Sequence, residues 1–219
     1  MEVINFDKEF SLVSVFMREL RDTQIQKDSM RFRHNLNRIG QIMAYEISKR
    51  LTPKAVDVTT PLGVAKCQTI GENVVLGTIL RAGLPFHNGF LNYFDNAQNA
   101  FVSAYRKFKE KNSNQIEINI EYIASPNLDG KTLIIIDPML ATGGSMELAY
   151  RALLTKGTPE KIFIASVIAS KSAVEYIQNS FPEDKTTVFI GAIDDVINEN
   201  SYIVPGLGDA GDLAYGIKE

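Results

Sequence analysis

The chain has 219 residues, of which 45% are hydrophobic and 22% charged, and its formal net charge is −3 at pH 7. This composition is typical of a globular protein with a substantial core. It does not favour the dense basic face that a duplex nucleic-acid binder needs. Cys67 is the only cysteine, which excludes an intrachain disulfide, and we expect it to be an inert small residue.

The N-terminus lacks the apolar core of a signal peptide, because acids and a lysine interrupt it. The longest apolar runs have the length of a strand and fall far short of a membrane span. We therefore expect a soluble, cytoplasmic protein that binds neither nucleic acid nor membrane.

The first part of the chain, about residues 7–50, is expected to be helical. Apolar residues recur at spacings of three and four between residues 29 and 50, which is typical of an amphipathic helix. Its buried face would carry Phe32, Leu36, Ile39, Met43 and Ile47. A weaker pattern predicts an earlier helix with Phe6, Phe10, Val13, Met17 and Leu20 on one face.

Between about residues 70 and 200, short apolar runs alternate with segments of helix length. Strands are expected at 74–80, 100–106, 131–137, 161–169 and 186–192, and helices at 85–94, 145–157 and 172–181. Runs that are apolar on both faces and alternate with helices indicate an α/β fold, with an open, mostly parallel sheet and helices on both faces.

Residues 115–123, QIEINIEYI, alternate strictly between apolar and polar. This pattern predicts a half-exposed antiparallel strand, and the polar residues 107–114 before it complete a β-hairpin arm. No linker or repeat is visible, so we expect a single domain over residues 1–219.

Two glycine-containing motifs do not carry the function that their letters suggest. Residues 206–211, GLGDAG, match the dinucleotide fingerprint, but Pro205 precedes them and the few residues that follow leave no room for the required helix and acid. Residues 125–132, SPNLDGKT, end like a P-loop, but Ser125 replaces the first glycine and the run leads into a strand. Nicotinamide or flavin binding and ATP hydrolysis are therefore disfavoured.

Residues 134–145, IIIDPMLATGGS, lead from a buried strand through an aspartate into a small, glycine-rich run. Ligands of a parallel sheet bind beyond the carboxyl ends of its strands. Residues 141–145 are therefore expected at a helix N-terminus, where N–H groups and the helix dipole favour an anion. Gly143 and Gly144 allow close approach, Thr142 and Ser145 add hydroxyl donors, and Asp137 can accept hydrogen bonds from sugar hydroxyls. The pattern predicts a ribose 5-phosphate site, and a merely tight, capped turn is the alternative.

DPMLATGGS resembles the 5-phosphoribosyl-1-diphosphate (PRPP) motif of the phosphoribosyltransferases, in the variant of the uracil phosphoribosyltransferase family. ILRAGLPF at 79–86, AYRK at 104–107 and YIVPGLGDAGDLAYG at 202–216 are similar to the same family. The resemblance implies the phosphoribosyltransferase fold with a C-terminal base-binding hood. It also implies an enzyme of pyrimidine salvage that converts uracil and PRPP to UMP and pyrophosphate.

The resemblance implies that Asp137, Asp209 and Arg81 are catalytic, and that Arg81 and Arg106, each following an apolar strand, hold pyrophosphate. A surface role is the alternative for both arginines, more so for Arg106 among its lysine neighbours. The implied PRPP-binding residues are Arg81, Arg106, Asp137, Pro138, Met139, Leu140, Ala141, Thr142, Gly143, Gly144, Ser145 and Asp209. The implied uracil-binding residues are Tyr202, Ile203, Gly208, Asp209 and Ala210.

Mg²⁺ is expected to enter with the diphosphate, near Asp209, rather than to be held by the protein alone. The resemblance further implies a homodimer or larger homo-oligomer and raises GTP as an activator. Leu213 stands where the family often carries a basic residue. Two other readings remain: a regulatory protein that senses a nucleotide and contacts RNA, and a phosphoribosyltransferase for a purine, which residues 202–212 disfavour.

Overall fold

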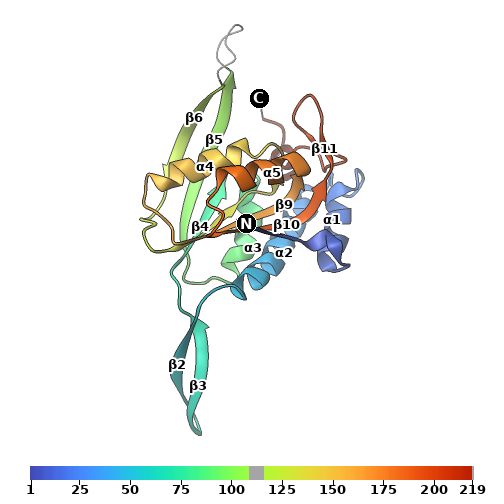
Figure 1. Ribbon diagram of the computed structural model, residues 1–219. Helices are drawn as coiled ribbons and strands as arrows, with labels where there is room; N and C mark the ends of the chain where they lie inside the picture. The colour runs from blue at the N-terminus through green and yellow to red at the C-terminus, as the bar shows by residue number, and fades with distance from the viewer. Residues whose placement is uncertain (109–115, 219) are drawn as a thin grey trace.

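The computed structural model describes the backbone of residues 1–108 and 116–218, and their side chains except at 104–108 and 116–121. The main sheet consists of β1 (Glu2–Asn5), β4 (Val74–Ile79), β5 (Gln98–Phe108), β6 (Ile116–Ala124), β7 (Thr132–Ile136), β8 (Met139–Leu140), β9 (Lys161–Ser170) and β10 (Thr186–Asp194). Along the sheet the order is β1-β10-β9-β7-β4-β5-β6, with β8 paired to β9 (Figure 1). Only the β5–β6 pair of this sheet is antiparallel in the described residues, which confirms the mostly parallel sheet.

Helices cover both faces of this sheet (Figure 1). One face carries α1 (Leu12–Arg21), α2 (Ser29–Ser48) and α3 (Gly83–Leu91), and the other carries α4 (Gly144–Leu154) and α5 (Lys171–Ser180). Strand β7 shows why: Ile134 and Ile136 join the core beneath α2 and α3, while Leu133 and Ile135 join the core beneath α4. A strand that is apolar on both faces needs cover on both, as the sequence indicated.

The N-terminal helices follow the expected pattern only in part. All five apolar residues predicted for the helix at 29–50 are buried in α2. The earlier helix begins only at Leu12, after a capping box at Ser11. The prediction that it includes Phe6 and Phe10 is wrong, because Phe6 lies in a short 3-10 turn, η1 (Phe6–Lys8), and Phe10 is 88% exposed. Among the described residues, no helix is long and apolar enough to cross a membrane.

Two antiparallel hairpins leave the body of the molecule at opposite ends (Figure 1). The expected arm is confirmed as β5 and β6, which pair from Phe101 with Ala124 to Phe108 with Ile116. The second hairpin, β2 (Pro53–Thr60) with β3 (Gly63–Ile70), was not predicted, and Cys67 lies exposed on it.

The C-terminal segment contains β11 (Val196–Ile197), β12 (Ile203–Val204) and α6 (Ala210–Tyr215). β11 and β12 form a small antiparallel pair, and α6 lies against α2. Arg33 of α2 donates a hydrogen bond to the Ala214 carbonyl over 2.6 Å. The N-terminal helices therefore support the segment that the sequence assigned to the base.

Candidate active site

A cavity of about 480 Å³ lies beyond the carboxyl ends of β4 and β7. Its lining combines Arg81 and Ala82 after β4, residues 137–139 after β7, and residues 209–211 at the start of α6. These segments are far apart in the chain, but the carboxyl ends of neighbouring parallel strands meet at one edge of the sheet. The cavity therefore lies where ligands of such sheets bind.

A smaller cavity of about 190 Å³ adjoins the first, because Met139 and Ser145 line both. We call residues 141–145 around it the phosphate cup. Helix α4 begins within the cup at Gly144, as predicted, so its first N–H groups lie where an anion would bind. The two adjoining cavities suit an elongated ligand with a phosphate at one end.

Gly143 is the N-cap residue of α4 and has a φ of 82°, a conformation that favours glycine. A Cβ atom on Gly143 would also lie 2.6 Å from Cδ1 of Tyr176 on α5. The Tyr176 hydroxyl donates a hydrogen bond to Glu147 of α4, which fixes the ring beside the cup. Both the backbone and the neighbouring ring therefore require glycine at this position.

The connection from β7 into the cup is tied to β9. The backbone N–H groups of Val167 and Ile168 both donate to the Pro138 carbonyl, at 3.1 and 3.0 Å. The Met139 N–H donates to Oδ1 of Asp137 over 3.3 Å. These bonds hold the Asp137 carboxylate at the wall of the larger cavity.

Solvent reaches part of the Asp137 side chain, yet protein atoms surround the carboxylate closely. This burial raises the pKa of Asp137 to about 7, and the Met139 N–H bond only partly opposes the shift. A carboxylate that changes charge near neutral pH at a cavity wall is a candidate for function.

Arg81 and Asp209 are brought together from distant parts of the chain. Nη2 of Arg81 donates to Oδ1 of Asp212 over 2.9 Å, and Nη1 donates to the Gly216 carbonyl over 3.3 Å. Oδ1 of Asp209 accepts from the Asp212 N–H at 3.0 Å and so caps α6. A Cβ atom on Gly211 would lie 3.1 Å from the Asp209 carboxylate and 3.2 Å from Arg81, so the two side chains flank this glycine.

Most of the predicted PRPP-binding residues lie around the two cavities. The larger cavity is lined by Arg81, Asp137, Pro138, Met139, Ser145 and Asp209, and the smaller by Met139, Leu140, Ala141, Thr142, Gly143 and Ser145. Arg106 was expected to follow the end of a strand, and this expectation is wrong. It lies within β5, opposite Ile118 of β6. Its side chain is outside the described residues.

The predicted uracil-binding residues divide into two groups. Asp209 and Ala210 line the larger cavity. Among the described residues of the C-terminal segment, Tyr202, Ile203 and Gly208 lie outside both linings, and Ile203 is buried in the core. Ile203 and Gly208 belong to the stretch that leads to Asp209.

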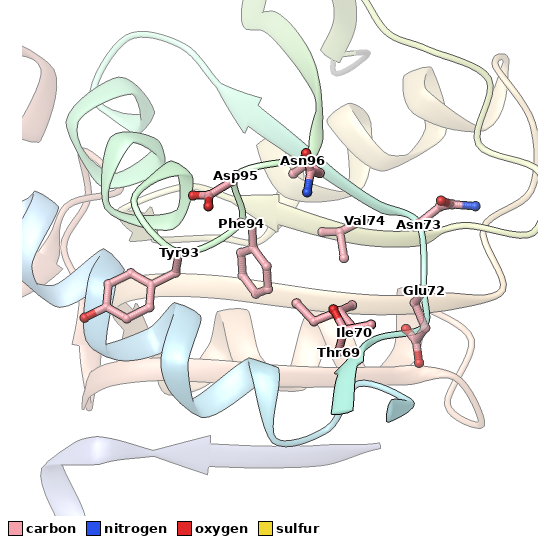
Figure 2. A pocket seen from close by; sticks show the side chains of 10 residues that line it. Thr69, Ile70, Glu72, Asn73, Val74, Tyr93, Phe94, Asp95 and Asn96 are labelled. Carbon is pink, nitrogen blue, oxygen red and sulfur yellow. The ribbon is translucent and has the colours of Figure 1, made fainter. Parts of the chain in front are cut away.

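Sequence reasoning missed Ser103 and Lys218, which also line the larger cavity. Neither belongs to a motif, and no local pattern distinguishes them from other polar residues. A separate hollow of about 370 Å³ lies at the opposite edge of the sheet, between Ile70, Val74 and Phe94 (Figure 2). It contains none of the predicted site residues, so we do not assign it to the active site.

In the part of the chain that the structure describes, no three His, Cys, Asp or Glu side chains group together as metal ligands. Asp137 and Asp209 nevertheless line one cavity. Mg²⁺ is commonly bound by one or two carboxylates together with substrate phosphates and water. The two aspartates therefore fit an ion that arrives with a diphosphate.

The family model described as uracil phosphoribosyltransferase matches residues 9–217. The chain belongs to the uracil phosphoribosyltransferase family. It is 62% identical over 218 residues to a uracil phosphoribosyltransferase of Porphyromonas gingivalis, and the match covers 100% of both chains. A uracil phosphoribosyltransferase of Pyrococcus furiosus is 37% identical over 201 residues, which are 90% of this chain and 83% of the relative.

Two solved structures share the fold of this chain. The AQ2163 protein from Aquifex aeolicus superposes with a TM-score of 0.85 at 31% identity and covers 98% of each chain. A hypoxanthine phosphoribosyltransferase from Staphylococcus aureus gives a TM-score of 0.50 at 14% identity, over 85% of this chain and 84% of that one. At that identity the second likeness shows the fold alone, which is the phosphoribosyltransferase fold.

Proposed function

We propose that this protein is an enzyme that transfers the 5-phosphoribosyl group of PRPP to N1 of uracil, giving UMP and pyrophosphate. One observation carries the proposal: a single cavity joins Arg81 and the PRPP motif residue Asp137 to Asp209 and Ala210 of the C-terminal segment. Family membership over residues 9–217 supports the same reaction. The comparisons give no support to the RNA-binding alternative.

The reaction breaks the bond between C1 of the ribose and the pyrophosphate oxygen, and N1 of uracil forms the new bond to C1. Positive charge develops on the sugar and negative charge on pyrophosphate. The site must therefore supply orientation and fixed charges rather than a protein nucleophile. Arg81 matches the pyrophosphate position, because a guanidinium stays charged and can grip phosphate oxygens bidentately.

The phosphate cup would hold the 5-phosphate of PRPP. The backbone N–H groups at the start of α4 supply donors, and Ser145 and Thr142 add hydroxyl groups. Asp137, next to the cup, would accept hydrogen bonds from the ribose hydroxyls. Those bonds favour its ionised form, and the ionised form then stabilises positive charge on the sugar.

The segment from Tyr202 to Ala210 would hold uracil. A pyrimidine presents two carbonyls and an N–H, which backbone groups can read, and Gly208 with a φ of 90° leaves the backbone accessible. Asp209 and Ala210 reach the cavity directly. Tyr202 and Ile203, which lie outside the cavity lining, would support the stretch of chain that leads to Asp209 and Ala210.

Asp209, together with Asp137 in the lining of the same cavity, would help to hold the magnesium that arrives with the diphosphate. When bound, it neutralises charge on the leaving pyrophosphate. Arg81, which follows β4, would also neutralise charge on the leaving pyrophosphate. Asp209 meanwhile caps α6, because its Oδ1 accepts a hydrogen bond from the Asp212 N–H.

The homo-oligomer implied by the family resemblance gains support from the second hairpin, β2–β3. An isolated two-stranded hairpin is marginal in water, and this one exposes Val58, Leu62 and Val64, with Leu62 fully exposed. A dimer that covers these residues would stabilise the hairpin. Light scattering after replacement of residues 54–69 by a short glycine linker should show a shift from dimer to monomer.

GTP activation and a cytoplasmic location stay predictions. The first is tested by adding GTP to the transfer assay, where a rise in turnover at a fixed PRPP concentration is expected. The second is tested by fractionating cells of the source organism, where the protein should remain with the soluble enzymes.

The decisive experiment follows labelled uracil into UMP with PRPP and Mg²⁺, for the wild-type protein and Asp209→Asn. Asparagine caps a helix as well as aspartate does, so the substitution keeps α6 and removes only the charge. UMP formed by the wild type and largely lost in the variant supports the proposal. A wild-type protein that forms no UMP, with or without GTP, contradicts it.

A further inference from the structure

An ion pair of two side chains, Arg21 and Asp194, joins the N-terminal helices to the end of β10 beside the C-terminal segment. Nη1 of Arg21, at the end of α1, donates to Oδ2 of Asp194, and Nη2 donates to Oδ1, both over 2.8 Å. Asp194 ends β10, and its side chain is only 8% exposed. This bidentate geometry fixes both side chains more firmly than a single contact would.

Both backbone polar groups of Gly206 are bound to this pair. The Gly206 N–H donates to Oδ2 of Asp194 over 2.8 Å, and the Gly206 carbonyl accepts from Nη1 of Arg21 at 3.1 Å. Burial opposes ionisation of Asp194, but the bonds from Arg21 and the Gly206 N–H outweigh it and keep the pKa of this carboxyl below its usual range. The pair is therefore charged, and it holds one peptide group from two sides.

Gly206 is the point at which the segment folds back on itself. Its φ is 63°, and a Cβ atom there would lie 2.0 Å from the Ile203 carbonyl oxygen. Gln26, in the connection after α1, adds a second tie: its Nε2 donates to the Leu20 carbonyl over 2.7 Å and to the Leu207 carbonyl over 3.2 Å. The course of the chain from Ile203 to Leu207 is thus set by side chains of the N-terminal region.

We propose that Arg21 and Asp194, assisted by Gln26, are positioning residues for uracil, which hold the backbone that leads to Gly208, Asp209 and Ala210 in the conformation that reads the base. Neither Arg21 nor Asp194 lines the cavity, so they act through Gly206 and not on the substrate. The inference rests on the proposed function. Backbone groups that bind a base must keep their positions to within well under about 1 Å, because a displacement of about 1 Å already lowers the rate greatly.

The test is the kinetic behaviour of Arg21→Lys. Lysine keeps the positive charge near Asp194, but one ammonium cannot bridge both carboxylate oxygens and the Gly206 carbonyl. We expect KM for uracil to rise about tenfold, while KM for PRPP changes less than about twofold. Asp194→Asn should show the same split, and the double variant should be no worse than about the poorer single one, because the two side chains act as a unit.

A matched control is another bidentate arginine–carboxylate pair, Arg50 with Glu2, whose two contacts are 2.5 and 2.9 Å. Arg50→Lys should leave both KM values unchanged. A purely structural role for Arg21 would lower the amount of folded enzyme and leave both KM values as they are. Arg21→Lys that is folded and has an unchanged KM for uracil, or equal rises in both KM values, overturns the proposal.

Arg21→Lys is not the only variant that decides the question. If it does not fold, Gln26→Met removes the two carbonyl contacts at nearly constant side-chain length. A KM for uracil that rises about threefold then supports positioning, and an unchanged value overturns it. A wild-type protein that forms no UMP would instead contradict the proposed function, so the two failures are distinguishable.

Discussion

Arg81 and Asp212 lie 131 positions apart in the chain, and Nη2 of Arg81 donates a hydrogen bond to Oδ1 of Asp212 over 2.9 Å. The pair joins the β4 side of the cavity to α6. The Arg81 side chain is 41% exposed, and an ion pair of that kind contributes little stability. A diphosphate carries more charge than one carboxylate, so it can replace Asp212 as the partner of Arg81.

Arg81→Lys should lower kcat/KM for PRPP by about 10- to 100-fold, because lysine keeps the charge but loses the bidentate grip on phosphate. The free energy of unfolding should change by less than about 1 kcal/mol, since the pair with Asp212 is exposed. Steady-state kinetics and urea unfolding measure the two effects. Arg50→Lys, which alters an exposed pair with Glu2 of β1, is the control and should leave kcat/KM unchanged. An Arg81→Lys enzyme as active as the wild type would remove Arg81 from the pyrophosphate site.

Asp137→Asn should abolish most transfer activity while it stabilises the ligand-free protein above pH 7. The pKa of Asp137 is raised to about 7 when folded and is near 4 when unfolded. The contribution of the protonated Asp137 carboxyl to the free energy of unfolding is therefore fully present below pH 4. It is lost as the pH rises to about 7, because the unfolded chain releases this proton at a lower pH than the folded chain does. Asparagine cannot ionise, so the Asp137→Asn protein does not lose stability in this way as the pH rises.

The measurement is urea unfolding of both proteins between pH 4 and 9. The gain of Asp137→Asn over the wild type should grow from pH 4 to about pH 7 and stay constant above that, at about 1–3 kcal/mol. A gain that is the same at pH 4 and pH 8 would show that burial does not control this carboxyl.

Gly143→Ala should raise KM for PRPP about tenfold, since the new methyl group lies against Tyr176 and displaces the phosphate cup. Gly130→Ala is the matched control: Gly130 has a φ of 66°, and nothing lies within 4 Å of its Cβ position. Both variants carry the backbone strain of about 1 kcal/mol that alanine has at positive φ. Only Gly143→Ala should change KM, and equal KM values would reject the cup as the phosphate site.

Glu72→Gln should lower the free energy of unfolding at pH 7 by about 1–3 kcal/mol. Burial opposes ionisation of Glu72, but hydrogen bonds from Lys161, Thr132 and Thr52 outweigh it and lower its pKa to about 2. This contribution is present above the unfolded pKa near 4.5 and is lost as the pH falls toward 2.

Urea unfolding at pH 7 and pH 3 tests the Glu72 prediction, and the difference between variant and wild type should shrink at pH 3. Glu46→Gln, in the exposed pair with Lys49, should change stability by less than about 0.5 kcal/mol at either pH. A Glu72→Gln effect that does not depend on pH would assign its cost to packing.

The parts of the fold that were predicted from sequence are those with a hydrophobic period. Helix α2 shows its buried face at every turn, and β7 is apolar on both sides because helices cover both. The hairpin β2–β3 is exposed on both faces, so it has no such period. β1 has four residues, too few to show one, and Phe10 continued the helical spacing although it is exposed.

The site residues likewise divide into those that a local sequence pattern predicts and those that only the tertiary fold brings to the cavity. The phosphate cup was predictable because strand, aspartate, glycines and helix follow one another in residues 134–145. Ser103 and Lys218 reach the cavity only through the tertiary fold, and so do Arg21 and Asp194, which are 173 positions apart. No spacing along the chain marks such a pair.

The composition of the larger cavity has a consequence for biosynthesis. Its walls at Arg81 and Asp137 are translated well before the wall formed by residues 209–211 and Lys218. N-terminal parts of a chain fold first during translation. A nascent chain can thus form the phosphate cup while the opposite wall is still unmade, so catalytic competence arises only after residues 209–218 have also been translated and folded.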